Sequence, residues 1–388
     1  MDLRSTLDRL LNDACAGNRI PGVVATVADD KGIVYEGAAG LRSCDKPEKM
    51  TVDTVAWYAS MTKAVTGAAA MQLVERGKLS LDAPAGKVVP FLGKVQVMEG
   101  FDAAGKPRLR APKGTVTLRN LLTHSAGFSY EIWNPEAGRE LESRGAGNVL
   151  SGTQATLDRP LLADPDTKWD YAPGIDWAGR MVEEVSGQRL GDYMRANLFE
   201  PLGMNSVTFR LGPKHRERLA GLHARTPEGT IVPYPMEVGQ DSPLDMGGHA
   251  LYGTLPDYLR FTRMILGGGT LEGSRVLEPK TIAAMSQNQM GDLFVTPMPA
   301  APPFSNAVDW WPGVPCKWGL SFLINTQPTP QGRSAGSLSW AGLANSYYWI
   351  DPVKKVTGAV STQILPFYDG PVVQLFNDLE TAVYQSLS

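Results

Sequence analysis

The chain begins with apolar residues at helical spacing, followed by two strand-like runs. The helical spacing covers residues 3–14 and predicts a helix that ends near Gly17. Runs rich in valine, alanine and isoleucine follow at 22–28 and 33–39, and the Asp29-Asp30-Lys31-Gly32 stretch between them is typical of a hairpin turn. The amino-terminal end is therefore expected to form a helix and then a hairpin.

The carboxyl-terminal part predicts further strands and a closing helix. Strand-like runs cover residues 317–325, 346–350 and 356–362, and residues 371–387 place apolar side chains on one helical face. Strands at both ends of the chain favour one antiparallel sheet built from the two termini. The predicted fold class is α+β, with a mixed α/β domain whose central antiparallel sheet is flanked by helices, plus a mainly helical inserted domain.

The middle of the chain, from about residue 80 to about residue 290, predicts short helices and loops. Helices are expected over residues 117–124, 175–186, 190–199 and 254–266. The last of them begins with Thr254 and has Asp257 three residues later, which is a helix-capping pattern. Residues 291–315 interleave prolines with Trp310 and other aromatic residues, which predicts a loop that packs over a pocket.

Composition and charge exclude several classes of protein. The 388 residues carry 37 Lys+Arg and 40 Asp+Glu, so the formal net charge is -3. This balance, without a basic run, argues against a nucleic-acid partner, and no apolar stretch reaches the roughly 20 residues that span a membrane. The three cysteines lie at unrelated spacings, which suggests neither disulfides nor a metal site, and the acidic amino terminus does not resemble a signal peptide. We expect a cytoplasmic protein that acts on a small, weakly charged molecule.

Ser60 and Lys63 place a nucleophile and a base at helical spacing. An alanine-rich helical pattern runs from Ser60 to Glu75. Residues three apart on a helix are neighbours, with Cβ atoms about 5 to 6 Å apart, so Lys63 can reach the serine hydroxyl. A helix N-terminus favours negative charge on the serine oxygen, and a buried lysine loses affinity for its proton. The alternative is an exposed helix start without chemistry, and these residues alone leave it open.

A second copy of the same spacing occurs at Ser43 and Lys46. It lies in a polar stretch with no apolar helix behind it, so nothing there would remove the lysine from water. We expect this copy to be a solvated loop.

Three blocks of sequence, in a fixed order, carry a resemblance to a known family. They begin with Ser60-Met-Thr-Lys63, Tyr171-Ala-Pro173 and Trp340-Ala-Gly342, and residues 118–127 and 252–261 support them. The chain resembles the serine β-lactamase and penicillin-binding-protein superfamily, and most closely the family VIII carboxylesterases. The resemblance covers most of the chain and implies a β-lactamase-like fold. It fits an α/β domain of residues 1–80 and 290–388, a helical domain of residues 81–289, and an active site in the cleft between them.

The resemblance also implies roles for individual residues. Ser60 would be the acylated nucleophile, Lys63 its proton acceptor or the group that lowers a partner's pKa, and Tyr171 the phenol that relays the proton. The backbone N–H groups of Ser60 and Leu343 would form the oxyanion hole, and Trp340, with Ala341 and Gly342, would wall the cleft. Four other aromatic residues either line an apolar pocket or belong to the core: Phe128, Tyr130, Trp133 and Trp310.

Two departures from the lactamase pattern bear on the substrate. Trp340 stands where lactamases and peptidases usually have a lysine, so the cation for a substrate carboxylate is missing. Pro173 stands where the tyrosine motif usually ends in asparagine, which removes an amide for an acylamino side chain. Ester hydrolysis needs neither group. The sequence therefore predicts a serine carboxylesterase for small, largely apolar esters, without metal or cofactor, and with weak cephalosporin hydrolysis as a side reaction.

Other functions stay open on the same fold. They are an acyltransferase, a β-lactamase or D-Ala-D-Ala peptidase-like enzyme, and an inactive protein that only binds its ligand. The His124-Ser125 pair resembles part of a nucleophile elbow, but the preceding residues predict a helix and not a strand, so we expect His124 to be a structural helix-end residue. His215, His223 and His249 lack the spacing of a zinc site and are expected to be structural or surface residues.

Overall fold

A seven-stranded antiparallel sheet organises one side of the molecule. The protein is described here by a computed structural model that covers residues 2–387. The strands of this sheet are β1 (Gly22–Asp29), β2 (Ile33–Gly40), β11 (Cys316–Trp318), β12 (Leu323–Asn325), β13 (Leu338–Gly342), β14 (Ser346–Asp351) and β15 (Val356–Ser361). Within the described residues their order is β11-β12-β13-β14-β15-β1-β2, and each neighbouring pair is antiparallel. Because β1 pairs with β15, the prediction of one sheet built from both ends of the chain is confirmed.

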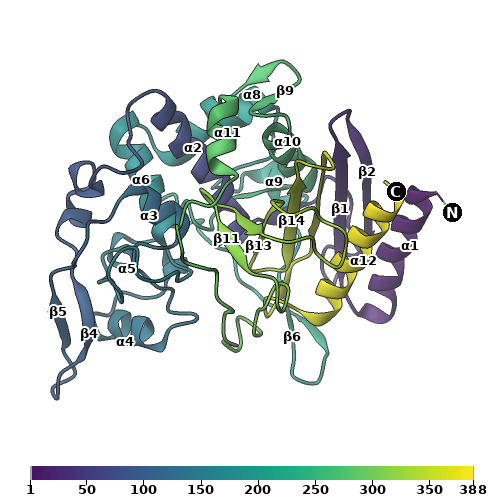
Figure 1. The fold of residues 1–388 in the computed structure, drawn as a ribbon. Coiled ribbons are helices and arrows are strands. Elements are labelled where there is room, and N and C mark those ends of the chain that lie inside the picture. The colour runs from purple at the N-terminus through teal and green to yellow at the C-terminus, as the bar shows by residue number, and fades with distance from the viewer. Residues whose placement is uncertain (1, 388) are drawn as a thin grey trace.

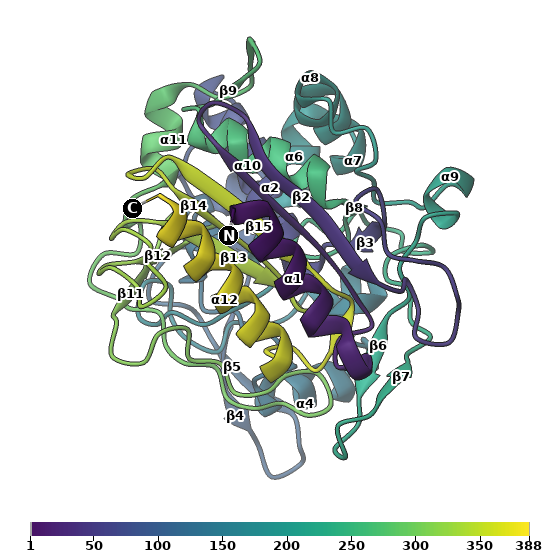
Figure 2. The same ribbon diagram turned by 90° about the vertical axis from the view of Figure 1, so that its right-hand side faces the viewer.

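Helices cover both faces of this sheet. The first helix, α1 (Leu3–Cys15), and the last, α12 (Gly370–Ser386), lie side by side on one face (Figures 1 and 2). On the other face, α10 (Leu255–Leu266) packs against β1, β14 and β15. The strands β14 and β15 are buried along their whole length, as expected for strands covered on both sides. The predicted α+β class is confirmed.

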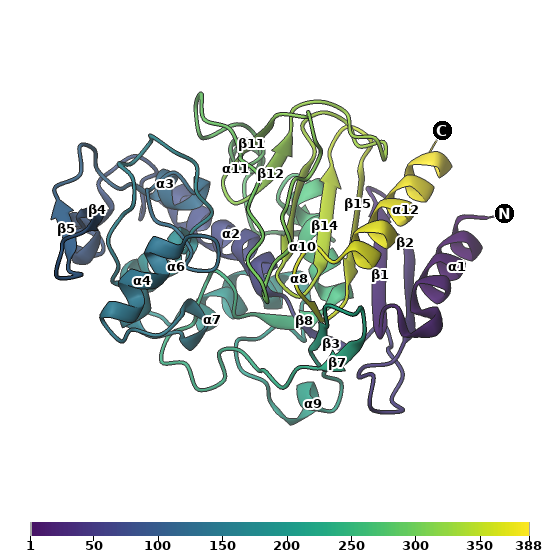
Figure 3. The same ribbon diagram turned by 90° about the horizontal axis from the view of Figure 1, so that it is seen from below.

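The remaining helices come from the middle of the chain. They are α2 (Thr62–Glu75), α3 (Leu118–Thr123), α4 (Pro135–Ser143), α5 (Gln154–Leu157), α6 (Gly174–Ser186), α7 (Leu190–Met194), α8 (Glu200–Leu202), α9 (Pro213–Arg216) and α11 (Pro279–Met285). The helices α3, α4, α5 and α6 lie on the side of the molecule away from α1 and α12 (Figures 1 and 3). Every residue of α2 from Thr62 to Leu73 is buried, so α2 is a central helix, and it packs against α6.

The chain between β2 and β11 also contains short strands that periodicity did not predict. They are β3 (Val55–Trp57), β4 (Val97–Phe101), β5 (Pro107–Arg110), β6 (His223–Arg225), β7 (Ile231–Pro233), β8 (Tyr252–Thr254), β9 (Thr270–Leu271) and β10 (Ser274–Arg275), with β16 (Ile364–Leu365) pairing to β6. Most have only two or three residues, which is too short for an alternating pattern to stand out from loop sequence. The pair β3–β8 matters most here, because β3 leads directly to Ser60.

Two predicted elements need correction. The single strand expected over residues 317–325 is wrong, because β11 and β12 form a hairpin. Gly319 donates its N–H to the carbonyl of Phe322 at 2.8 Å to close the turn, and the apolar sequence gives no sign of it. The α-helix expected over residues 190–199 is α7 followed by a π-helical turn, Arg195–Phe199. In contrast, the cap at Thr254 is confirmed, since its hydroxyl accepts the N–H of Asp257.

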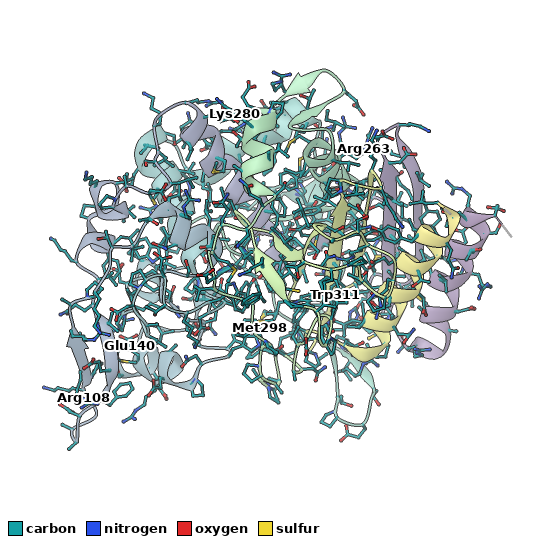
Figure 4. All side chains as sticks on the ribbon, in the orientation of Figure 1. Arg108, Glu140, Arg263, Lys280, Met298 and Trp311 are labelled. Carbon is teal, nitrogen blue, oxygen red and sulfur yellow. The ribbon has the colours of Figure 1, made fainter. Side chains whose placement is uncertain are left out.

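The proline-rich segment of residues 291–315 is an ordered loop beside the sheet. Trp310 packs on Trp340 of β13 with a ring-centroid distance of 5.4 Å. Trp311 is buried to 8% exposure, with the Arg333 guanidinium 5.0 Å from the centroid of its ring. Figure 4 labels Met298 and Trp311 on this segment. The loop therefore supports β13 from the side, and through β13 it reaches the candidate site.

The domain boundaries predicted at residues 81 and 289 stay a prediction, and their outer ends, Met1 and Ser388, lie outside the described residues. One helix complicates them, because α10 belongs to the middle of the sequence but covers the sheet. None of the helices within residues 2–387 combines the length and the apolar character that crossing a membrane requires.

Candidate active site

Ser60 lies at a sharp turn between a strand and the central helix. The strand β3 ends at Trp57, a 3-10 turn covers Ala59–Met61, and α2 begins at Thr62. Ala59 has a φ of 47°, in the left-handed region that costs a non-glycine residue about 1 to 2 kcal/mol. Strain of this kind persists only where the surrounding structure imposes it, and it is common beside reactive groups. The turn presents the Ser60 hydroxyl at the head of α2.

Lys63 is buried beneath that serine. Its Nζ lies 3.2 Å from Ser60 Oγ, 3.1 Å from the hydroxyl of Tyr130 and 2.7 Å from the carbonyl oxygen of Gly248. The side chain has no exposed surface, and this burial lowers the pKa of Lys63 from its usual value to about 7, although the Asp176 carboxylate opposes the shift. When the amine is neutral, its lone pair can accept the proton of the Ser60 hydroxyl. The contact has the geometry of a nucleophile and its base.

Tyr171 lies against the same lysine. The Lys63 Nζ is 4.8 Å from the centre of the Tyr171 ring, and Trp340 donates its indole N–H to the Tyr171 hydroxyl oxygen at 2.9 Å. Burial raises the pKa of Tyr171 above its usual value, while hydrogen bonds with Ser60 and Trp340 act in the opposite direction. The phenol therefore keeps its proton at neutral pH and can donate it.

The end of β13 comes close to the turn that carries Ser60. A Cβ at Gly342 would overlap the carbonyl oxygen of Tyr58, so only glycine permits this approach. Leu343, the next residue, lines the same cavity as Ser60. Ser60 and Leu343, the two residues predicted for the oxyanion hole, therefore lie on the two segments that meet here. Their role in catalysis stays a prediction.

An apolar cavity opens at Ser60. About 310 Å³ of space lies between its lining atoms, and this volume includes space that is open to solvent. The cavity is lined by Trp57, Ala59, Ser60, Tyr130, Ile132, Trp133, Val149, Leu150, Tyr171, His249 and Leu343. Among these described residues none is charged at neutral pH, because burial lowers the pKa of His249 to about 3. The cavity suits an uncharged, largely apolar molecule.

The predicted pocket residues fall into three groups. Tyr130 and Trp133 line the cavity. Trp340 lies behind Tyr171, with ring centroids 4.9 Å apart, and Ala341 and Gly342 continue β13 beside it. Phe128 is fully buried, and Trp310 packs behind Trp340. Neither residue is among those that line the cavity.

Two residues of this site carried no functional prediction. Asp176 is 2% exposed, and its Oδ1 accepts the N–H of Gly248 at 2.7 Å. His249 lines the cavity, and its Nδ1 lies 3.8 Å from the same oxygen of Asp176. A signal for Asp176 was present, because it stands between Ile175 and Trp177 on an otherwise apolar stretch of a predicted helix. Nothing in the sequence around His249 indicated that its loop returns to Lys63.

Ser125, the alternative nucleophile beside His124, has different surroundings from those of Ser60. His124 ends α3 with a φ of 58°, and its Nδ1 accepts the N–H of Ala172 at 3.3 Å, as expected of a structural residue. Ser125 is 1% exposed and lies 2.9 Å from the hydroxyl of Thr123 and 3.2 Å from the amide of Asn120. Neither residue lines the cavity at Ser60.

Comparisons with known proteins identify the family and its fold. The family model described as Beta-lactamase matches residues 7–382. The chain is 29% identical to the monacolin J acid methylbutanoyltransferase of Aspergillus terreus over 97% of this chain and 95% of that protein. It is 29% identical to the lovastatin esterase of Penicillium rubens over 95% and 94% of the two chains. The solved structure of unliganded simvastatin synthase from Aspergillus terreus superposes with a TM-score of 0.86 at 28% identity, covering 100% of this chain and 99% of that one.

Proposed function

Since the chain belongs to the Beta-lactamase family, we propose that it is a serine esterase that forms an acyl-enzyme on Ser60 with the help of Lys63 and Tyr171. The observation that carries this proposal is the Ser60 hydroxyl, which lies 3.2 Å from the amine of the buried Lys63 and at the wall of a cavity with an uncharged lining. An ester bears no charge, so it can enter this cavity without leaving an ion unpaired.

Acylation follows from the contacts around Ser60. Neutral Lys63 takes the proton of the Ser60 hydroxyl as the oxygen attacks the ester carbonyl carbon. The backbone N–H groups of Ser60 and Leu343 stabilise the resulting oxyanion. Tyr171 donates its proton to the alcohol oxygen as the bond between carbonyl carbon and alcohol breaks, and the Lys63 cation returns a proton to the phenolate. The alcohol leaves, and the acyl group stays on Ser60 as an ester.

Deacylation uses the same groups in the opposite direction. A water molecule, or a second alcohol, takes the place of the departed alcohol. It gives its proton to Tyr171 and Lys63, which act together as the general base. The new oxygen attacks the acyl carbon, and the proton returns to Ser60 Oγ as the acyl–serine bond breaks. No metal or cofactor takes part in this scheme.

Acyl transfer to an alcohol is the second candidate. The apolar lining of the cavity favours it, because an apolar wall holds an organic acceptor better than it holds water. The names of two relatives, a methylbutanoyltransferase and an esterase, describe these two outcomes of one acyl-enzyme. Product analysis with added alcohol separates the two, since transfer yields a new ester and hydrolysis yields the free acid.

Lactam and peptide substrates are less suited to this site. Both kinds usually carry a carboxylate, and Trp340 occupies the place where the lysine for it would stand. The Trp340 indole N–H is already donated to Tyr171. We therefore expect cephalosporin hydrolysis to be a weak side reaction at most.

The proposed function is tested by p-nitrophenyl butyrate hydrolysis at pH 8. Wild-type protein should turn over the ester, and Ser60→Ala should lose at least about a thousandfold in kcat, because no nucleophile remains. The matched control is Ser125→Ala, which removes the hydroxyl of a buried serine and should keep the wild-type rate. Equal rates for wild type and Ser60→Ala would contradict the assignment, and loss of activity in Ser125→Ala alone would move the nucleophile to that serine.

A further inference from the structure

A buried carboxylate reaches Lys63 through the backbone of one glycine. Asp176 lies in the first turn of α6, five residues after Tyr171. Its Oδ1 accepts the N–H of Gly248 at 2.7 Å, and the carbonyl of the same glycine accepts a hydrogen bond from Lys63 Nζ at 2.7 Å. A Cβ at position 248 would overlap Asp176, so this approach requires glycine.

The environment gives the negative charge of Asp176 a strong effect on the lysine. The Asp176 side chain has no exposed surface, and its Oδ2 has no hydrogen-bond partner among residues 2–387. Two opposite charges in a buried site of low dielectric constant interact much more strongly than two charges at the protein surface. Burial raises the pKa of Asp176 and lowers the pKa of Lys63, and in each case the charge of the other residue opposes the shift.

The other groups that face this pair do not compete with it. They are His124, His249, Tyr130, Tyr171 and Arg159. Burial lowers the pKa of both histidines and raises the pKa of both tyrosines, so all four stay neutral between about pH 5 and pH 9. The Arg159 guanidinium is paired with the Glu131 carboxylate at 2.8 Å. Asp176 is thus the carboxylate whose charge bears on the protonation of Lys63.

We propose that Asp176 is a positioning residue for the reaction, which holds the Gly248 backbone against Lys63 and maintains the proton affinity that the lysine needs to take the proton of Ser60. A lysine buried without this charge would be a much weaker base, and base catalysis weakens as the base loses proton affinity. The role in turnover rests on the proposed function, whereas the effect on Lys63 can be measured without any substrate.

The test is a pH titration of Lys63 by NMR in protein labelled with ¹³C at the lysine ε-carbon. The Lys63 signal is assigned by its loss in Lys63→Met. In Asp176→Asn the side-chain oxygen still accepts from Gly248, but the charge is gone. We expect the titration midpoint of Lys63 to fall by about one to two pH units. Should this variant fail to fold, Asp176→Ser, whose hydroxyl can also accept a hydrogen bond, carries the same expectation.

A matched control is Asp351→Asn. Asp351 is also fully buried and accepts backbone N–H groups, but it lies at the end of β14 away from Ser346, which pairs with Gly342. It should leave the Lys63 midpoint unchanged. An unchanged or higher midpoint in Asp176→Asn, or an equal fall in Asp351→Asn, would overturn the proposal.

The rate of ester hydrolysis separates this proposal from the proposed function. In Asp176→Asn the acidic limb of the pH–kcat profile should move to lower pH with the NMR midpoint, while the rate at high pH falls. A moving midpoint in a protein without esterase activity would uphold the Asp176–Lys63 coupling and reject the function. Esterase activity with an unmoved limb would uphold the function and reject the role of Asp176.

Discussion

The chain contains the Ser-x-x-Lys spacing twice, and the two copies have different surroundings. At Ser60 the motif starts a helix that is buried from Thr62 to Leu73, and Lys63 has no exposed surface. At Ser43 it forms a turn, closed by the N–H of Lys46 donating to the carbonyl of Ser43 at 3.2 Å. There the serine hydroxyl donates to Asp45, and the lysine is exposed.

The difference shows that the spacing by itself does not make a nucleophile. Lys63 gains its chemistry from burial, from Tyr130 and Gly248, which hold Nζ beneath Ser60, and from the strained turn at Ala59. In the outer copy, which comprises Ser43 and Lys46, the lysine side chain is exposed to solvent instead. The following predictions break or sharpen this comparison, beginning with the largest effect.

The largest effect is expected from removing the lysine amine of the inner copy, which comprises Ser60 and Lys63. Lys63→Met retains an apolar side chain of similar length, and kcat for ester hydrolysis should fall by about a hundredfold to ten-thousandfold, as for the loss of a general base. Steady-state kinetics at pH 8 measure it, with a thermal melt to show that the protein is folded. Lys46→Met makes the same change in the outer copy and should retain full activity. A similar loss of kcat in Lys63→Met and Lys46→Met would contradict the functional difference between the two copies.

The pH profile of the wild type tests the burial of the inner lysine. Lys63 must be neutral to accept the Ser60 proton, and burial lowers its pKa to about 7. Protonation below that pH removes the base, so kcat should fall about a hundredfold between pH 8 and pH 5. A profile flat to pH 5, or an acidic limb near pH 10 where a solvated lysine titrates, would show that Lys63 does not have this role.

A smaller effect is expected where Trp340 supports the inner copy. Trp340→Phe keeps an aromatic ring in β13 but removes the N–H that is 2.9 Å from the Tyr171 hydroxyl. One neutral hydrogen bond contributes about 1 kcal/mol, so kcat should fall about fivefold to tenfold. Trp310→Phe changes the ring behind Trp340 and should stay within about twofold of wild type. Equal effects would mean that packing, and not the hydrogen bond, explains the loss.

The smallest effect is expected from the outer serine. Ser43→Ala removes the hydroxyl that donates to Asp45, which should cost at most about 1 kcal/mol in the free energy of unfolding. Ester hydrolysis should be unchanged. Denaturant unfolding and initial rates on the same preparation check both statements, and a tenfold loss of rate would show that the outer copy contributes to the reaction.

The elements whose apolar residues recur at a regular spacing over many residues were predictable. The helices at both ends, the hairpin of β1 and β2 and the α+β class follow from regular apolar spacing, and the structure confirms them. The hairpin at Gly319 and the short strands of the middle stretch were missed, because two or three residues carry no periodicity. Their positions depend on contacts with residues far away in the sequence, such as β3 with β8.

The candidate site was predictable only where a motif carries it. Ser60, Lys63 and Tyr171 stand in recognisable blocks, and the structure brings them into contact. Asp176 and His249 were not predicted, because their proximity to Lys63 arises when the 247–249 loop returns to the head of α2 and α6. The lining of the cavity by Ile132, Val149 and Leu150 likewise depends on tertiary packing of loops.

The most direct test of the two-copy comparison is labelling of the wild-type protein with a fluorophosphonate, followed by peptide mapping by mass spectrometry. The reagent forms a covalent bond with an activated serine and ignores an ordinary hydroxyl. We predict a single adduct, on the peptide that contains Ser60, with the Ser43 and Ser125 peptides unmodified. An adduct on Ser43 or Ser125, or no adduct on Ser60, would contradict the assignment of Ser60 as the nucleophile.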